Sequence, residues 1–537
     1  MKTPAPTEPP GAPSPFAPFG HRAFAVIWTA TLVSNIGTWM YSSACGWLMT
    51  ELNPSPLMVS LVQVATSLPL FLFAMPAGAL TDSLDKRKLL AWGESAITAI
   101  SAVFAVLVWL KLVTAPVLLI FTFLVAAGGA FTAPGWQAIT PLLVPRDDLQ
   151  PAVAANSVGV NVSRAIGPAL GGALLGVFGI AAPFVINAVA NLGVIFAMVW
   201  WRPPHRRSSS LPPEHIWAAI GAGVRYARFS RPLSSTLIRC AGFFVFASAY
   251  WALLPLVVRT QVSGGPTLYG VLLGVIGASA VGGAFALPWL NARLGPDRLA
   301  VAGALGASAA TALFGLAHAA PVALLASAVA GVSWIASLSS LNTSAQTALP
   351  EWVRGRGLAL YVTVMFGSLS VGSLLWGQAA AGFGVAEALF AAAAGGAVAA
   401  FGLRRWKLHA GAGLDLSPAM HWPSPVTAGD FDHTRGPVLV TLDYQIDPAD
   451  RSAFLEALRR LGRERRRDGA YRWRVYEDPA VKGRFVEIFM DDSWTDHLRH
   501  HERITNADRA LEAAVHRFQV GEGPVTTHLL GVETDVR

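Results

Sequence analysis

The sequence has 537 residues, of which 53% are hydrophobic and 13% are charged, whereas a soluble domain is typically about 25% charged. This composition excludes an ordinary soluble protein and indicates a large membrane protein. The formal net charge is +8, but the basic residues gather in short gaps between apolar segments. They are therefore expected to mark one face of a membrane, and no nucleic-acid partner is expected.

The chain opens with a segment rich in proline and small residues, and residues 1–22 are expected to form a disordered tail. The segment has no basic start followed by an apolar core, so it does not resemble a secretory signal. A helix needs about 20 apolar residues to cross a bilayer. Cutting the sequence at charged and Pro/Gly gaps gives twelve spans: 24–50, 56–80, 89–110, 116–140, 152–178, 182–201, 234–258, 268–290, 299–317, 322–348, 357–380 and 384–403.

The Lys and Arg residues predict the orientation of these spans. With the N-terminus inside, the even-numbered gaps hold most of the basic residues, while the odd gaps hold little more than Lys111 and Arg259. Because cytoplasmic loops carry an excess of Lys and Arg, both termini are expected to be cytoplasmic.

The longest gap divides the spans into two sets of six, at residues 23–201 and 233–403, and residues 202–232 are expected to be a cytoplasmic linker. The two halves echo each other. Gln137-x-x-x-Pro141 matches Gln346-x-x-x-Pro350, and Gly167-x-x-x-x-Gly172 matches Gly372-x-x-x-x-Gly377. Two related six-helix bundles are typical of transporters whose substrate site lies between the halves.

The stretch Gly78-Ala-Leu-Thr-Asp82-Ser-Leu-Asp-Lys86-Arg87-Lys88 follows the second span. It resembles the signature that the major facilitator superfamily carries between its second and third helices, with Asp85 in place of the usual later glycine. Gly78 would permit close helix approach, and Asp82, Lys86 and Arg87 would make charge contacts that hold one conformation shut. A positive-inside loop would explain the basic residues but not the preceding Gly-x-Leu-x-Asp.

The fifth span contains Gly167-Pro168-x-x-Gly171-Gly172. It resembles the Gly-Pro-rich motif of the fifth helix in exporters of the same superfamily. The glycines would allow close packing, and Pro168 would free a carbonyl and bend the helix, as a hinge or seal requires. Ordinary small-residue packing is the alternative. The matching position in the eleventh span is Ser373.

Two ionisable residues lie inside spans. Arg164 precedes the Gly-Pro motif; it is expected either to face the transport pathway or to extend to the cytoplasmic surface. Glu94, early in the third span, is the best candidate for a proton-coupling carboxylate, and a structural ion pair is its alternative.

The resemblance implies that the first, fourth, seventh and tenth helices line a central cavity. The polar and aromatic residues expected to line this pathway, together with Arg164, are Asn35, Trp39, Gln137, Trp251, Asn342 and Gln346. Such a set suits a bulky amphipathic molecule better than a sugar or an ion.

The remainder of the chain has a soluble composition, with a linker expected at 404–435 and a domain at 436–537. Strand-like alternation at 437–446 is followed by a helical pattern to about 468, two further strand-like runs, helical stretches to about 518 and a last strand-like run at 526–530. The order β-α-β-β-α-β predicts a cytoplasmic ferredoxin-like domain.

Within this domain, His497 and His501 are four residues apart and share a helix face. The run lacks the H-E-x-x-H spacing of zinc enzymes, and Arg499 and Arg503 would repel a cation. A polar packing face is therefore favoured, and no metal ligand, cofactor or catalytic residue is assigned.

The tail, from Arg465 through Asp468-Gly-Ala-Tyr-Arg-Trp473 and the histidine run, resembles that of the transmembrane secretion effector exporters, similar to the enterobactin exporters. The resemblance implies a multi-pass protein of the bacterial inner membrane, with proton antiport. It also implies a tail with the fold of small antibiotic-biosynthesis monooxygenases, which commonly dimerise, so the tail is interpreted as a regulatory or homodimerising module.

The sequence thus predicts an all-α polytopic membrane protein with twelve helices in two bundles and an α+β ferredoxin-like tail. Its predicted function is secondary active export, by alternating access, of a bulky amphipathic small molecule of the drug or siderophore class. No G-x-x-x-x-G-K-[ST] phosphate loop is present, so ATP drive is not expected. The alternative is a membrane-anchored bifunctional protein whose tail is a monooxygenase-like enzyme.

Overall fold

The computed structural model describes residues 14–202, 216–409, 415–419, 422, 432 and 434–532, without the side chains of residues 79, 82, 83 and 216–220. Parts of the predicted tail and linkers therefore lie outside the described residues. The chain forms two compact units. The first comprises Met1–Pro213, Arg239–Ser340 and Val362–Arg405, and the second comprises Glu214–Ile238, Leu341–Tyr361 and Trp406–Arg537.

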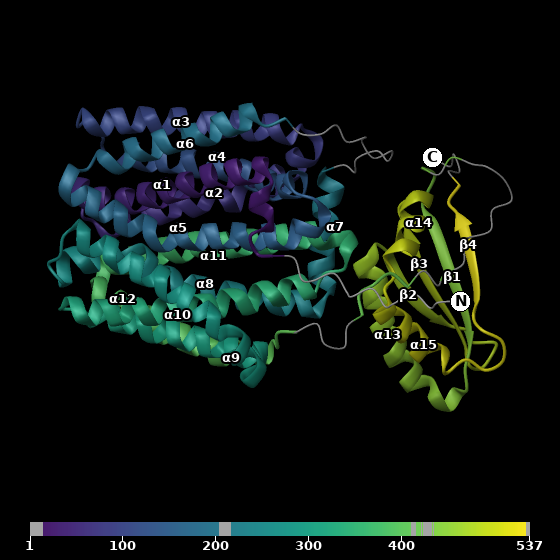
Figure 1. Ribbon diagram of the computed structural model, residues 1–537. Helices are drawn as coiled ribbons and strands as arrows, with labels where there is room; N and C mark the ends of the chain where they lie inside the picture. The colour runs from purple at the N-terminus through teal and green to yellow at the C-terminus, as the bar shows by residue number, and fades with distance from the viewer. Residues whose placement is uncertain are drawn as a thin grey trace, which may run out of the picture. The chain divides into compact units, whose positions relative to one another are not determined.

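Long apolar helices dominate the first unit, where they run side by side (Figure 1). In the described part of the chain, 11 helices are long and apolar enough to cross a membrane. These helices are α1 (Arg22–Leu52), α2 (Pro56–Ser83), α3 (Lys86–Trp109), α4 (Ala115–Leu143), α5 (Leu149–Phe178), α6 (Ala182–Trp200), α8 (Arg231–Leu256), α9 (Pro266–Gly315), α10 (Ala320–Thr347), α11 (Arg354–Phe383) and α12 (Val385–Gly402).

Helix α9 is too long for one crossing. Its 50 residues would extend about 75 Å as a regular helix, against a hydrocarbon core of about 30 Å. At Gly295 the backbone is not helical, with φ 73° and ψ 162°, and this residue separates two helical stretches. Glycine permits this positive φ because it has no Cβ.

Two segments differ from the sequence-based expectation. Residues 17–20 form a short 3₁₀ helix within the predicted tail, and Phe19 packs edge-on against Phe24 and Trp28 of α1. Within the predicted linker, α7 (Ile216–Phe229) is helical and buries Tyr226 and Ala227. Both segments are short and flanked by proline-rich sequence, so their apolar side chains gave no spanning pattern.

The tail contains a four-stranded sheet formed by β1 (Val438–Gln445), β2 (Tyr471–Glu477), β3 (Arg484–Asp491) and β4 (Val525–Leu530). The strand order is β2-β3-β1-β4, and all neighbouring strands are antiparallel. In β1 alternate residues are buried, as expected for a strand with one face against a core. The buried Tyr444 lies opposite Phe485 in the β1–β3 register.

Three helices lie beside this sheet: α13 (Arg451–Asp468), α14 (Trp494–Arg503) and α15 (Asn506–His516) (Figure 1). Phe454, Leu458 and Leu461 lie on one face of α13 and are buried in the core. Side chains of Ser493 and Thr505 cap α14 and α15, which satisfies free N–H groups at the helix starts.

Arg467 is the centre of a buried charge network in the second unit. Its Nη2 lies 2.7 Å from Asp468 Oδ2 and 2.8 Å from Asp508 Oδ2, and its guanidinium stacks on the ring of Tyr226 in α7. Burial raises the pKa of Tyr226, and its hydroxyl donates to the carbonyl of Ala348. The arginine thus joins α13, α15 and α7.

Arg467→Met is expected to destabilise this domain by about 3–5 kcal/mol, because it leaves buried carboxylates without their cation. The matched control is Arg460→Met on the same helix, whose partner Glu456 and own side chain are both mostly exposed; its effect should stay below about 1 kcal/mol. Urea unfolding of the domain in the full-length protein, monitored by pulse proteolysis, measures the stability of both variants. Equal midpoints for the two variants would show that the network does not stabilise the domain.

Candidate functional site

Helices α5 and α9 meet along small residues. A Cβ added at Gly172 would lie 2.6 Å from the Pro266 carbonyl oxygen and 2.8 Å from the Gly270 Cα. One added at Gly277 would lie 2.6 Å from the Ala165 Cα. Such distances leave no room for a side chain, so the two backbones touch. We call this contact the α5–α9 seam: Ala165, Ala169 and Gly172 on α5, with Gly270, Gly274 and Gly277 on α9.

The other glycines of the Gly-Pro motif pack α5 against α1. A Cβ on Gly167 would lie 2.5 Å from the Trp39 Cβ, and one on Gly171 would lie 2.7 Å from Ser43 Oγ. Pro168 is buried within α5, which is helical throughout Leu149–Phe178. The motif therefore allows α5 to contact a helix of its own half and a helix of the other half.

The matching glycines of α11 make the equivalent contacts. A Cβ on Gly372 would overlap Ser248 and Val245 of α8, and one on Gly377 would overlap Ser60 of α2. Nearby, the hydroxyls of Ser67 and Ser370 join α2 to α11 at 2.8 Å. The echo in the sequence thus corresponds to two contacts between the halves, α5 with α9 and α2 with α11.

Among the described residues, the two halves contact each other in the middle of the bundle and at one end. The contacts are hydrogen bonds and closely packed glycines. This is the end where α1 stops at Leu52 and α2 begins at Pro56. Here Arg259 Nη1 donates to Thr50 Oγ1 at 3.0 Å, and the rings of Trp47 and Tyr269 pack at 6.0 Å. We call it the α1–α2 end, and it is closed in this structure.

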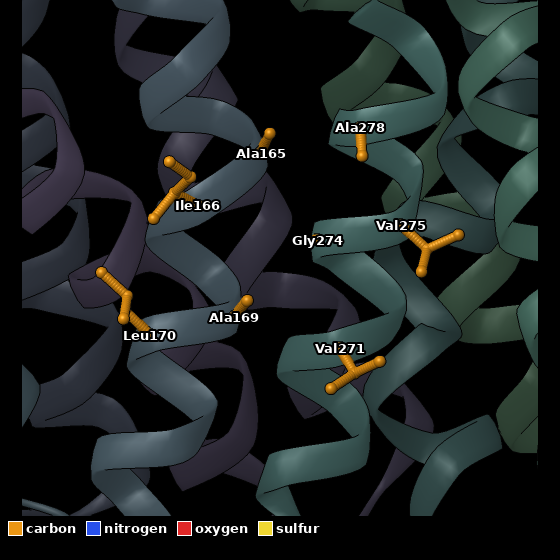
Figure 2. Close-up of a pocket in the computed structure, with 8 residues that line it drawn as sticks. All are labelled: Ala165, Ile166, Ala169, Leu170, Val271, Gly274, Val275 and Ala278. Atoms are coloured by element: carbon orange, nitrogen blue, oxygen red, sulfur yellow. The ribbon is translucent and has the colours of Figure 1, made fainter. Parts of the chain in front are cut away.

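A shallow groove of about 390 Å³ runs along the seam (Figure 2). Its eight lining residues are Ala165, Ile166, Ala169, Leu170, Val271, Gly274, Val275 and Ala278, all without polar side chains. Ligand sites normally contain a few convergent polar groups. Since Ile166, Leu170 and Val271 are also exposed, we interpret the groove as the outer surface of the seam and not as the pathway.

Arg164 lies over Trp39. The guanidinium carbon is 5.4 Å from the indole centroid, within cation–π range. Its Nε is buried and has no hydrogen-bond partner among the described residues. Of the predicted pathway residues, these are the two that the structure brings together.

The other predicted pathway residues are not joined to this pair by described hydrogen bonds or ring contacts. Trp251 on α8 packs against Trp334 at 5.4 Å, and its buried Nε1 has no hydrogen-bond partner in the described chain. Asn35 on α1 is half-buried and Gln137 on α4 is exposed. Asn342 and Gln346 are exposed residues near the end of α10, in the second unit.

The contacts predicted for the loop between α2 and α3 are described only in part. A Cβ on Gly78 would meet no described atom within 4 Å, so the close approach predicted there is absent from this conformation. Arg87 donates to the carbonyls of Met198 and Val199 at the end of α6, where a cation is favourable. Lys86 begins α3, and the Asp82 side chain lies outside the described residues.

Glu94 is a buried carboxylate on α3, with 7% of the residue exposed. Trp136 of α4 donates its indole N–H to Glu94 Oε1 at 2.9 Å. No Lys or Arg of the described residues forms an ion pair with it. The described surroundings of Glu94 thus provide a neutral hydrogen-bond donor and no ion-pair partner.

The histidine run forms a buried cluster in the tail. His497 is fully buried and its Nδ1 lies 2.8 Å from Asp491 Oδ2. Burial, with repulsion from neighbouring imidazoles, lowers the pKa of His501 to about 3. Burial, with repulsion from His497, lowers the pKa of His528 to about 4. These two imidazoles are therefore neutral at neutral pH.

Sequence reasoning missed half of the seam and one member of the histidine cluster. The α9 side of the seam has a readable signal, Gly270-x-x-x-Gly274-x-x-Gly277, which is a small-residue helix-packing pattern. His528 has no such signal, because it reaches the cluster only through the pairing of β4 with β1.

Comparison with known proteins agrees with this architecture. The family model for transmembrane secretion effectors matches residues 13–535. An enterobactin exporter, EntS of Citrobacter koseri, is 28% identical over 392 residues, which cover 71% of this chain and 89% of that protein. An uncharacterized MFS-type transporter, YfiS of Bacillus subtilis (strain 168), is 28% identical over 310 residues, or 56% of this chain and 70% of that protein.

Solved structures share the fold at low sequence identity. A bacterial homolog of the human lysosomal transporter Spinster, inward-facing and unoccupied, has a TM-score of 0.58 at 14% identity, covering 73% of this chain and 98% of that one. The POT family transporter PepTSo has a TM-score of 0.58 at 13% identity, covering 72% and 97%. The matching family and the homologues indicate a multi-pass membrane transporter. The chain belongs to the transmembrane secretion effector family of the major facilitator superfamily.

Proposed function

We propose that this protein is a proton-coupled secondary exporter of bulky amphipathic small molecules, working by alternating access in the bacterial inner membrane. The observation that carries the proposal is the α5–α9 seam, because it joins the two halves through small residues alone. Backbones packed through glycine can separate and meet again without rearranging large side chains. Such a contact suits a seal that opens and closes once in each cycle.

The topology that goes with this proposal has twelve crossings, since α9 is divided at Gly295 and can cross twice. Positive-inside counting then puts both termini in the cytoplasm. The α1–α2 end becomes the outer end, and its closure corresponds to an inward-facing conformation. The open surroundings of Gly78, at the opposite end of α2, agree with this assignment.

The substrate class follows from the groups around Arg164. A buried guanidinium whose Nε has no partner among the described residues favours an anionic or oxygen-rich ligand, and the indole of Trp39 beside it offers an aromatic surface. Aromatic molecules with acidic oxygens match these protein groups. The name of the relative EntS, an enterobactin exporter, supports the siderophore class within this chemistry.

We propose a ferredoxin-like fold for the tail, which its strand order and antiparallel pairing support. We assign it a regulatory or homodimerising role, acting through α7, which packs on Arg467. The substrate carrier is the bundle itself.

Uptake into everted inner-membrane vesicles tests the proposal. We expect vesicles with the protein to accumulate enterobactin when their lumen is acidified, and to lose that accumulation when the proton gradient is collapsed. A hydrophobic cationic dye is the comparison substrate that separates siderophore-class from drug-class export. Vesicles that take up neither compound above the empty-vector level would contradict the proposal.

A further inference from the structure

Three imidazoles from different parts of the tail domain converge on one point. His497 and His501 lie on one face of α14, and His528 lies on β4. One ring nitrogen from each histidine lies within 4.8 Å of the others. The spacing of His497 and His501 in the sequence provided only two of these groups, and the fold supplies the third.

The separations suit ligands of a single cation. The Nε2 atoms of His497 and His501 are 3.1 Å apart. Ligand nitrogens on a tetrahedral Zn²⁺, with bonds of about 2.0–2.1 Å, lie about 3.3 Å apart. The rings of His497 and His528 are also close, with centroids 4.8 Å apart.

Asp491 on β3 fixes the orientation of the central ring. Its carboxylate accepts from His497 Nδ1 at 2.8 Å and from His500 Nδ1 at 3.2 Å. A carboxylate can only accept here, so the proton of His497 lies on Nδ1 and the lone pair on Nε2 faces the other two histidines. Metal-binding histidines typically have such an outer carboxylate partner.

The nearby arginines do not prevent a cation from binding. Arg499 Nη1 donates to Asp496 at 3.2 Å. Arg503 Nη1 donates to the Asp468 carbonyl at 2.7 Å, and its guanidinium stacks on Trp352. Both positive charges are thus engaged with other groups. His501 and His528 are half-buried, so an ion can reach the site from the surface while His497 stays fully buried.

We propose that His497, His501 and His528 bind one divalent transition-metal ion of the imidazole-preferring class, with Zn²⁺ as the first candidate. The three nitrogens leave a fourth position open toward solvent. The bound ion would join α14 to β4, an edge strand of the sheet, and would stabilise the folded domain by binding it in preference to the unfolded chain. The site is independent of the proposed export function.

Equilibrium dialysis of the full-length protein against Zn²⁺ tests this site, after the affinity tag has been removed and bound metal stripped with a chelator. The wild type is expected to bind one Zn²⁺ per chain. The affinity for Zn²⁺ should fall at least about tenfold in His501→Gln and in His528→Gln, because loss of even an outer partner of a metal ligand can cost that much. The matched control is His516→Gln on α15 of the same domain, which should bind as the wild type does.

Thermal unfolding of the same samples gives a second readout. Zn²⁺ should raise the unfolding midpoint of the wild type and the His516→Gln control but not that of His528→Gln. Two half-buried histidines are replaced separately in case one of the variants fails to fold. The binding result is taken from a variant whose unfolding midpoint in chelator equals that of the wild type. Absence of Zn²⁺ binding to the wild type, or binding by His501→Gln and His528→Gln that equals that of the wild type, would overturn the proposal.

Discussion

Replacing Gly277 by valine is expected to slow export by about 5- to 150-fold without unfolding the protein. A Cβ at this position would lie 2.6 Å from the Cα of Ala165 and 2.9 Å from the Arg164 carbonyl oxygen, both of which are backbone atoms. Neither can rotate away, so α5 and α9 must separate. Overpacking of this kind typically costs about 1–3 kcal/mol. If this cost destabilises only one of two conformations, the equilibrium between them shifts by about 5- to 150-fold.

The control for this prediction is Gly282→Val on the same helix, where an added Cβ would meet nothing within 4 Å. Both variants change a glycine of α9 to valine, so they share any effect of helix propensity. Initial rates of enterobactin uptake into everted vesicles, at equal protein content, compare them. If Gly277→Val and Gly282→Val transport at the same rate, the seam does not take part in the transport cycle.

Replacing Glu94 by glutamine is expected to abolish gradient-driven accumulation while leaving substrate exchange across the membrane intact. Glutamine keeps the size of the side chain, and its amide oxygen can still accept the indole N–H of Trp136. It cannot exchange a proton, so the energetic link between proton and substrate movement is lost. The measurement is uptake with an imposed pH gradient, set beside counterflow exchange at equal pH on both sides.

The chain contains a closely matched control for Glu94. Glu51 at the end of α1 also accepts an indole N–H, from Trp47 at 2.8 Å, but Glu51 is exposed. Glu51→Gln should therefore retain gradient-driven uptake. Loss of both uptake and exchange in Glu94→Gln would indicate a structural role for the carboxylate, and normal uptake would remove Glu94 from the coupling mechanism.

The elements of this protein follow closely from local patterns. Apolar length marks the membrane helices, and period-two alternation marks β1, because each reflects burial that neighbouring residues share. The Gly-Pro motif of α5 is also readable, since only small residues allow a contact as close as Gly172 with Gly270. These features depend on residues close together in the sequence.

The contacts between distant residues could not be read in this way. The pairing of Arg164 with Trp39 and of Glu94 with Trp136 depends on how helices rotate about their axes when they pack. The open surroundings of Gly78 depend on how the helices of the bundle pack in this structure, which no local pattern encodes. Arg467 reaches Tyr226 only because α7 is a helix, in a segment whose composition is that of a linker.

A reversible cross-link across the seam tests alternating access most directly. In this structure a Cβ on Gly274 lies 3.1 Å from the Ala169 Cβ, slightly below the separation of about 3.5–4.5 Å in disulfides. The Ala169→Cys, Gly274→Cys pair, made after the buried Cys45 and Cys240 are replaced by alanine, should oxidise readily. Export into everted vesicles should stop on oxidation and return on reduction. Full export by the cross-linked protein would contradict the account, because the seam would not need to open.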